Sequence, residues 1–329
     1  MKAIYIILLA VLLAFIVTVV VVSLGLSMPD IENTAFSKTG KAQYHFVMIG
    51  QNADEAFNSK VHSGAMEAAK DLNVAVEIED VRPADVYSAK ELFDKALASH
   101  VDGIAIQLRD NNISSEDLAK ASDMGISVVT FEADSAISAN IPTIGTNNFR
   151  AGAEAGKMAI RCLDGKGHVA VILNGVSSKD ENSQKNMRVS GMLDVFKNYP
   201  MMKIPAVQRT EGGIFSAEKA TLDILRDYPD INLIVATNEM DTLGIVDVLR
   251  DKNLLNRISV IGYGAQPETM AYVRRGVIYG TVVSDPKKIG YESIKALADL
   301  QESGYISSYN DTGIFTYTLE NVEQYKETE

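Results

Sequence analysis

The sequence predicts an α/β protein built from two lobes, each a doubly wound parallel β-sheet. Three observations predict this fold. Short apolar runs alternate with amphipathic segments of helical period from Tyr44 onward. The alternation starts again near Ala151, and the chain of 329 residues is long enough for two domains. Strands separated by helices of this length form parallel sheets that are covered on both faces.

The first residues form a separate apolar segment. Ala3 to Leu26 is a run of 24 residues without a charge, and about 20 apolar residues suffice to span a bilayer. Lys2 precedes the run, and Asp30 and Glu32 follow it, so the positive-inside rule sends the rest of the chain outside.

Residues 1–27 are therefore expected to be a retained transmembrane helix or, alternatively, a cleaved signal segment. The short polar stretch 28–41 is expected to tether the folded part. This interpretation predicts a single-pass protein of the cell membrane that contacts the lipid bilayer through its N-terminal helix. Its folded domain would lie on the extracytoplasmic side.

The first half of the folded part contains four expected strands. Each apolar strand is followed by a segment with apolar residues on one helical face. The expected strands are Tyr44–Ile49, Val74–Ile78, Gly103–Ile106 and Ser127–Phe131, and the helices are Ser59–Leu72, Asp85–Ala98 and Ser114–Met124.

The second half repeats this pattern. The expected helices are Ala151–Leu163, Ser183–Phe196, Ser216–Arg226, Leu243–Leu249, Pro267–Arg275 and Lys288–Gln301. The expected strands are His168–Leu173, one that begins at Val207, Leu233–Ala236, Ser259–Ile261 and Ile278–Val283. Ligands of such sheets bind beyond the carboxyl ends of the strands, so two facing lobes predict a clamp around one cleft.

Composition excludes several classes of function. The net charge of −12 leaves no basic surface for nucleic acid. The single Cys162 can form neither an internal disulfide nor a cysteine-based zinc site. The four histidines lack metal-site spacing, and no nucleophile elbow, phosphate loop or dinucleotide loop is present. The sequence therefore predicts neither an enzyme nor a cofactor.

Several stretches resemble the ribose- and galactose-binding proteins of the type I periplasmic-binding-protein class and the sensor core of lac-repressor-type regulators. The resemblance spans about Tyr44 to Tyr325. It rests on these stretches, taken in order: Gln51–Asn58, Val101–Ile106, Gly125–Asp134, Gly145–Asn148, Arg188 with Gly191, Ala236–Gly244, Val260–Gly264, Arg275–Gly276, Thr281–Pro286, Gly290–Tyr291, Asp311–Gly313 and Glu320–Val322.

The resemblance implies two lobes joined by a three-strand hinge. Residues 42–146 and 285–311 would form the N-terminal lobe, and 147–284 with 312–325 the C-terminal lobe. The crossings would lie near Thr146–Asn147, Ser284–Asp285 and Asn310–Thr312.

The resemblance also implies a set of ligand-binding residues. Carboxylates, amides and arginine exchange hydrogen bonds with sugar hydroxyls, and aromatic rings cover the apolar ring face. The matching positions are Gln51, Glu55, Phe57, Asn58, Glu132, Asp134, Arg188, Asn238, Tyr263 and Ser284.

The sequence departs from the ribose-binding pattern at several of these positions. Gly264 occupies the position of an aspartate in that pattern, and Ser284 the position of a glutamine. The arginine that the pattern usually has near Ala133 is absent from this sequence. The second aromatic face is missing, and Phe215 or Tyr263 is a candidate to supply it.

The expected function is that of an extracytoplasmic solute-binding protein. It would close on a monosaccharide or a similar small polyol and pass it to the permease of an ABC transporter. The alternative is a sugar-sensing subunit that signals to a membrane histidine kinase. A transcription regulator is excluded, because a membrane segment occupies the place of a DNA-reading domain.

Overall fold

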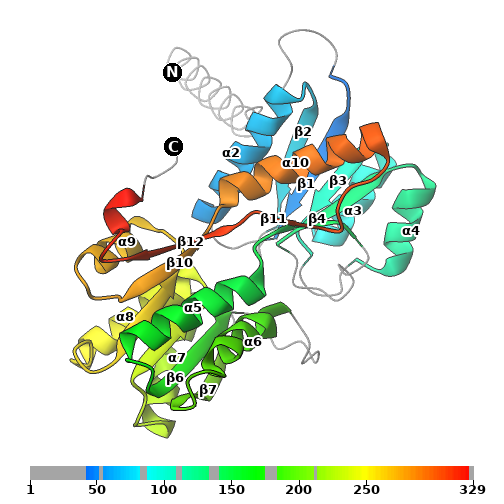
Figure 1. Cartoon of the computed structure of the whole chain (residues 1–329). Helices are drawn as coiled ribbons and strands as arrows, with labels where there is room; N and C mark the ends of the chain where they lie inside the picture. Colours follow the sequence, from blue (N-terminus) through cyan, green and yellow to red (C-terminus); the bar gives the residue numbers. More distant parts are fainter. Residues whose placement is uncertain are drawn as a thin grey trace, which may run out of the picture.

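The computed structural model describes residues 42–51, 55–81, 87–108, 113–132, 141–174, 184–210 and 213–325. The predicted membrane segment 1–27 and tether 28–41 lie outside the described residues. Across the described ranges, we find no helix with the length and apolar character needed to cross a membrane. The described chain folds into two α/β lobes (Figure 1), which confirms the predicted fold class.

The sheet of the first lobe is entirely parallel. Its strand order is β11-β5-β4-β3-β1-β2, with bounds β1 His45–Gly50, β2 Ala75–Asp80, β3 Gly103–Ile106, β4 Ser127–Phe131, β5 Thr143–Gly145 and β11 Tyr309–Asp311. One face packs on α2 Glu55–Asp71 and α10 Pro286–Ser303, and the other on α3 Ala89–Ala98 and α4 Ser115–Asp123. Both faces are therefore buried, as expected for parallel strands.

The sheet of the second lobe has the order β12-β10-β9-β8-β6-β7. Its strands are β6 Gly167–Asn174, β7 Met202–Thr210, β8 Leu233–Ala236, β9 Ser259–Tyr263, β10 Gly280–Ser284 and β12 Ile314–Thr318. The helices α5 Asn148–Cys162 and α6 Gln184–Phe196 cover one face. The other face packs on α7 Ile214–Asp227, α8 Glu239–Asp251 and α9 Pro267–Arg274, and a short 3₁₀ turn, Val322–Gln324, follows β12.

One strand departs from the predicted parallel arrangement, because β12 pairs with β10 in the antiparallel sense. Only Thr312 and Gly313 separate β11 from β12, so the chain crosses straight into the second lobe without reversing. It enters at the end where β10 leaves and must therefore run opposite to β10. A strand that arrives through a helix would instead have been parallel.

Several elements begin earlier than the sequence predicted, among them one strand and one helix of the second lobe. The strand expected to begin at Val207 begins at Met202 and runs through Pro205. β7 is the outermost strand of its sheet, where a proline that cannot donate to a neighbour is tolerated. The helix expected from Leu243 begins at Glu239, because the side-chain oxygen of Asn238 accepts from the backbone N–H of Asp241 and caps it.

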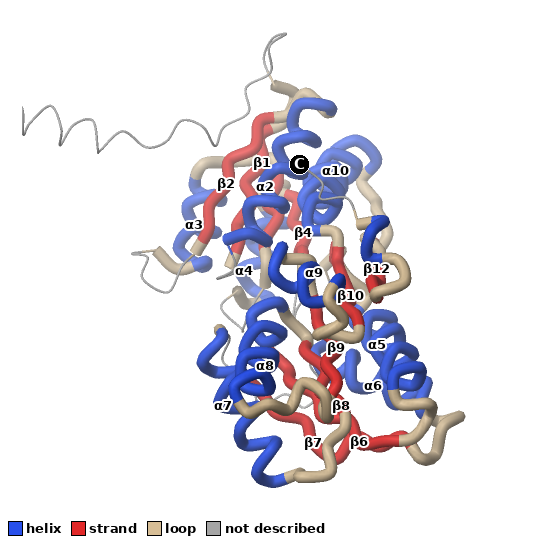
Figure 2. The backbone as a smooth tube through the Cα atoms, turned by 90° about the vertical axis from the view of Figure 1, so that its left-hand side faces the viewer, coloured by secondary structure: helices blue, strands red, loops and turns tan. Residues whose placement is uncertain are grey.

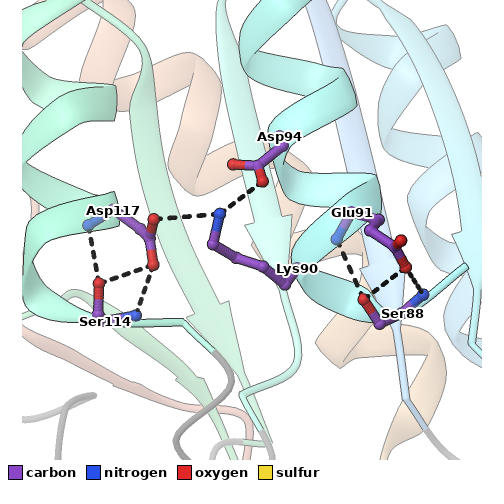
Figure 3. A network of polar contacts seen from close by, with 6 residues as sticks. All are labelled: Ser88, Lys90, Glu91, Asp94, Ser114 and Asp117. Atoms are coloured by element: carbon purple, nitrogen blue, oxygen red, sulfur yellow. Dashed lines mark hydrogen bonds and ion pairs between the residues drawn. The ribbon is translucent and has the colours of Figure 1, made fainter.

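Capping boxes position the two helices α3 and α4 of the first lobe (Figure 3). Ser88 and Glu91 exchange hydrogen bonds at the start of α3, and Ser114 and Asp117 do so at the start of α4. Lys90 of α3 reaches Asp117 of α4 at 3.2 Å and joins the two helix starts. The reciprocal bonds satisfy backbone donors that a helix start otherwise leaves unpaired.

In the described residues, the chain passes between the two sheets at three places. It crosses from β5 to α5, from β10 to α10 and from β11 to β12. Two of these crossings touch, since the backbone N–H of Thr312 donates to the carbonyl of Gly145 at 3.1 Å. Figure 2 shows the two sheets one above the other. The lobe boundaries named above remain a prediction.

Candidate functional site

The carboxyl ends of both sheets face the space between the lobes. Only Thr146 and Asn147 separate the end of β5 from α5 of the other lobe, and only Asp285 separates the end of β10 from α10. Connections this short require the ends of β5 and β10 to lie at the junction of the lobes. Because β4 runs parallel to β5 and β9 runs parallel to β10, the carboxyl ends of β4 and β9 lie there too.

Three of the predicted ligand-binding residues precede the helix expected from Ser59 but lie within helix α2. Glu55, Phe57 and Asn58 belong to the first turn of α2, which begins at Glu55. Glu55 is exposed, while Phe57 is partly buried and packs on the core of the first sheet. Residues three apart on a helix lie on one side of it, so Glu55 and Asn58 are neighbours at the helix start.

Gln51 is held by the neighbouring strand end. Its backbone N–H donates to the side-chain oxygen of Gln107 at 2.9 Å, and its side-chain amide donates to the carbonyl of Gln107. The side-chain nitrogen of Gln51 is thus already engaged at the end of β3.

Sequence reasoning missed a polar cluster that supports Asn58. The Asp80 carboxylate accepts from the Asn58 amide at 3.4 Å and lies 3.2 Å from His62 Nε2. Asp80 also approaches the backbone so closely that a Cβ at Gly50 would lie 2.2 Å from its oxygen. Two features of the sequence could have indicated this cluster. The β2 strand ends in the acidic pair Glu79-Asp80, and the β1 strand beside it ends in Gly50, which pairs with Asp80.

Glu132 lies at the first crossing between the lobes. Its backbone has φ +43°, and its carboxylate accepts from the backbone N–H of Thr146 at 2.6 Å. Burial, together with the nearby carboxylate of Glu132, raises the pKa of the Tyr309 hydroxyl. Tyr309 also donates to the carbonyl of Gly145 at 3.4 Å, so Glu132 lies among the crossing segments. Asp134 lies outside the described residues.

Arg188 and Tyr263 form the centre of the second lobe's contribution. The Arg188 guanidinium lies 4.3 Å above the centre of the Tyr263 ring. Its Nε donates to the side chain of Asn148 at 2.8 Å, and a terminal nitrogen donates to the carbonyl of Thr237. Three elements therefore orient one cation: α5, the end of β8 and the end of β9.

Asn238 lies two residues beyond the end of β8, and Ser284 is the last residue of β10. The side-chain oxygen of Asn238 is used to cap α8, so its amide N–H groups are what it offers a ligand. Thr242 donates to the carbonyl of Asn238 and accepts from the N–H of Tyr263, both at 2.9 Å, which links the two predicted residues. Ser284 is buried.

The two candidates for the missing aromatic face differ in their surroundings. One face of Tyr263 is covered by Arg188, whereas Phe215 in the first turn of α7 is 85% exposed. A phenylalanine ring this exposed near the carboxyl end of β7 is available to cover an apolar ligand face.

Two further hollows occur in the described surface. One runs along α10 and β11 and is lined by Glu292, Tyr305 and Tyr309. The other lies at the amino ends of β6 and β7, beside His168 and Met201. Neither hollow is lined by the residues predicted to bind the ligand.

Two α/β lobes with donors and acceptors at their facing strand ends define a two-lobed binding protein. Residues 46–304 match the periplasmic binding protein domain, and the chain belongs to that family. It has the fold of the type I periplasmic binding proteins, and its relatives are sugar-binding proteins and not enzymes.

Curated relatives and solved structures agree with this assignment. The chain is 23% identical over 279 residues to the D-allose-binding periplasmic protein of Escherichia coli K12, covering 82% of this chain and 88% of that one. It is also 23% identical to the ribose import binding protein RbsB of Bacillus subtilis 168 over 262 residues, 79% and 82% of the two chains.

Among solved structures, the glucose-galactose binding protein GanP of Geobacillus stearothermophilus has a TM-score of 0.76 and 27% identity. The match covers 86% of this chain and 99% of GanP. The XylFII structure has a TM-score of 0.71 and 25% identity, over 84% of this chain and 98% of XylFII.

Proposed function

We propose that this protein binds a monosaccharide, or a polyol of similar size, between its lobes and passes it to the permease of an ABC transporter. The observation that carries the proposal is the arrangement of Arg188 over Tyr263 beside the donor amide of Asn238. A fixed cation on an aromatic ring, next to amide donors, suits hydroxyls on an apolar ring.

The proposed site draws on both lobes. Glu132 and the start of α2, with Glu55, Phe57 and Asn58, belong to the first lobe, and Arg188, Asn238, Tyr263 and Ser284 to the second. A ligand contacted from both sides binds the closed form better than the open form and shifts the population toward closure. The closed surface would then be what a membrane partner recognises.

The relatives support a sugar as the ligand and a transporter as the partner. One is described as an import binding protein for ribose, and another as a periplasmic protein that binds D-allose. A sensing role remains the second candidate, because the same fold occurs in a complex of XylFII with LytSN, at a TM-score of 0.72 and 24% identity.

The first experiment is a thermal-shift screen of the purified full chain against aldopentoses, aldohexoses, polyols and amino acids. Binding to the native state alone adds about 2.7 kcal/mol to the free energy of unfolding at a ligand concentration of a hundred times Kd, and this raises the melting temperature. A rise with one aldose supports the proposal, and titration calorimetry then measures Kd. Rises with amino acids alone would overturn the ligand class.

A second experiment separates transport from sensing. Deletion of the gene should abolish uptake of the radiolabelled sugar if the protein feeds a transporter. Intact uptake with a lost transcriptional response to the sugar would instead support the sensor.

A further inference from the structure

The side chain of Glu239 fills a space beside the carboxyl end of β9. Gly264 follows that strand with φ +87°, and a Cβ built on it would lie 1.9 Å from Cγ and 2.0 Å from Oε1 of Glu239. The Glu239 carboxylate therefore occupies the volume that a side chain at position 264 would take. Gly264 is the residue that allows this approach, because it combines a positive φ with no side chain.

Hydrogen bonds hold the carboxylate in this place. The backbone N–H of Ala265 donates to Oε1 of Glu239 at 3.1 Å. Gly264 is itself fixed, since its N–H donates to the carbonyl of Val282 at 2.8 Å and its carbonyl accepts from Thr281 at 2.8 Å. The carboxylate is thus anchored on a rigid strand end while its backbone belongs to α8.

The neighbours of Glu239 are residues of the proposed sugar site. Asn238 precedes it in the chain, and Thr237 before that accepts from Arg188. Tyr263, which lies under Arg188, immediately precedes Gly264. An acceptor carboxylate, a donor cation and a donor amide therefore meet within one corner of the second lobe.

We propose that Glu239 is a ligand-binding residue that accepts hydrogen bonds from sugar hydroxyls. A carboxylate has two oxygens with about four acceptor positions, so the bond from Ala265 does not exhaust it. The inference rests on the proposed function, which supplies the ligand, and adds the acceptor that Arg188 and Asn238 do not provide, because both offer donors.

The charges of this corner also restrict the class of ligand. The proposed site contains the carboxylate of Glu239 from the second lobe and that of Glu132 from the first, and one arginine, Arg188. A neutral polyol, or one that carries an amine, suits this balance. A sugar acid or sugar phosphate adds a negative charge to an acidic site and binds more weakly.

The test is Glu239→Gln in the full chain, measured by titration calorimetry with the aldose that gives the largest shift in the screen. Glutamine keeps an oxygen for the N–H of Ala265 but loses the charge that strengthens bonds from hydroxyls. We expect affinity for the aldose to fall 10- to 100-fold, with the melting temperature of the ligand-free protein unchanged. Glu268→Gln, an exposed glutamate in the first turn of α9 bonded to Tyr272, is the matched control and should bind like the wild type.

A series of monodeoxy analogues of that aldose distinguishes a direct hydrogen bond between Glu239 and the sugar from an indirect structural effect of Glu239 on the site. If Glu239 binds one hydroxyl, the analogue lacking it should bind both proteins equally, while the other analogues keep the 10- to 100-fold ratio. The wild type should also bind the corresponding uronate at least tenfold more weakly than the aldose. In Glu239→Gln, the difference in affinity between the aldose and the uronate should be smaller.

Equal affinity of Glu239→Gln and the wild type for the aldose would overturn the role of Glu239, and so would one constant loss for every deoxy analogue. Both results leave sugar binding by the wild type intact. Failure of the proposed function is distinct, because the wild-type chain itself would then bind no aldose.

Discussion

Arg188 is positioned before any ligand arrives. It stacks on Tyr263, donates to Asn148 and donates to the carbonyl of Thr237. Each contact already restricts the rotamers of the long side chain in the free protein. Ordering a flexible side chain of this kind on binding costs about 0.5–1.5 kcal/mol, and Arg188 avoids part of that cost. Preorganisation of this kind favours tight binding by a small number of polar groups.

Replacement of Arg188 by alanine is therefore expected to weaken sugar binding without unfolding the protein. Hydrogen bonds to a charged group contribute about 1.5–3 kcal/mol, which corresponds to about a 10- to 100-fold rise in Kd. Calorimetry measures the affinity and circular dichroism the fold. Arg226→Ala is the control, because Arg226 lies at the far end of α7 and pairs with Asp223 and Asp227. An unchanged Kd for Arg188→Ala would remove Arg188 from the site.

Asp241 is a buried acid behind the site. Its side chain has no exposed surface, and its carboxylate accepts from the Thr210 hydroxyl at 3.0 Å. Burial raises the pKa of Asp241 from 3.8 to about 7, against the opposing effect of the bond from Thr210. The folded protein thus keeps a proton that the unfolded chain releases over this range of pH.

Stability should fall as pH rises through this window. An acid with a raised folded pKa contributes its stability fully below pH 3.8 and loses it as pH passes about 7. Asp241→Asn keeps the shape and carries no titrating proton. We expect the melting temperature of Asp241→Asn, relative to the wild type, to be higher at pH 8 than at pH 5. A difference that does not change with pH would show that Asp241 is not protonated in the folded state.

Each lobe contains one helix pair that packs through reciprocal glycines. In the first lobe, a Cβ at Gly64 of α2 would lie 1.8 Å from the carbonyl oxygen of Lys287, and one at Gly290 of α10 would lie 1.8 Å from that of Val61. The backbones touch because no side chain separates them.

The second lobe repeats this packing between α5 and α6. A Cβ at Gly152 would lie 1.9 Å from the carbonyl oxygen of Arg188, and one at Gly191 would lie 2.0 Å from that of Phe149. Since Arg188 belongs to α6, this close contact holds the backbone of Arg188 against α5.

Gly152→Ala is therefore expected to affect both stability and binding. The added methyl group meets backbone atoms, which cannot rotate away, and overpacking of this kind costs about 1–3 kcal/mol. The displaced α6 carries Arg188 with it, so affinity should fall as well. Thermal unfolding and calorimetry measure the two effects, and Ser190→Ala on the exposed side of α6 is the control. Normal stability and affinity in Gly152→Ala would show that the two helices separate without cost.

Two hydrogen bonds hold side chains near the proposed site to the crossing segments. Glu132, a proposed ligand residue, accepts from the N–H of Thr146, and Tyr309 donates to the carbonyl of Gly145. Both contacts join the site to the segments that must bend if the lobes close. Ligand binding and closure would therefore act on the same few bonds.

Closure should be visible for the whole molecule by small-angle X-ray scattering. We expect saturating sugar to reduce the radius of gyration of the wild-type protein, because both lobes contact one ligand. Arg188→Ala, at a sugar concentration that saturates only the wild type, should keep the larger radius. A radius that stays constant while calorimetry reports full binding would rule out closure.

Much of the fold could be predicted from the sequence because alternation of strands and helices is a local pattern. Apolar runs such as Gly103–Ile106 and periodic helices such as Ala89–Ala98 carry their own signals. The boundary missed at Pro205 depended on which strand lies at a sheet edge, which follows from tertiary placement. The boundary missed at Glu239 depended on the local cap that Asn238 provides.

The sequence alone predicted the two-lobed α/β class, because periodicity is a property of the chain itself, and the resemblance of its motifs to a known family implied a binding role and the residues that would contact a sugar. Only the tertiary structure decided that β12 runs antiparallel, that Arg188 stacks on Tyr263, and that the Glu239 carboxylate fills the space at Gly264. These three facts join residues from 25 to 75 positions apart, and such distances close only when the sheets form.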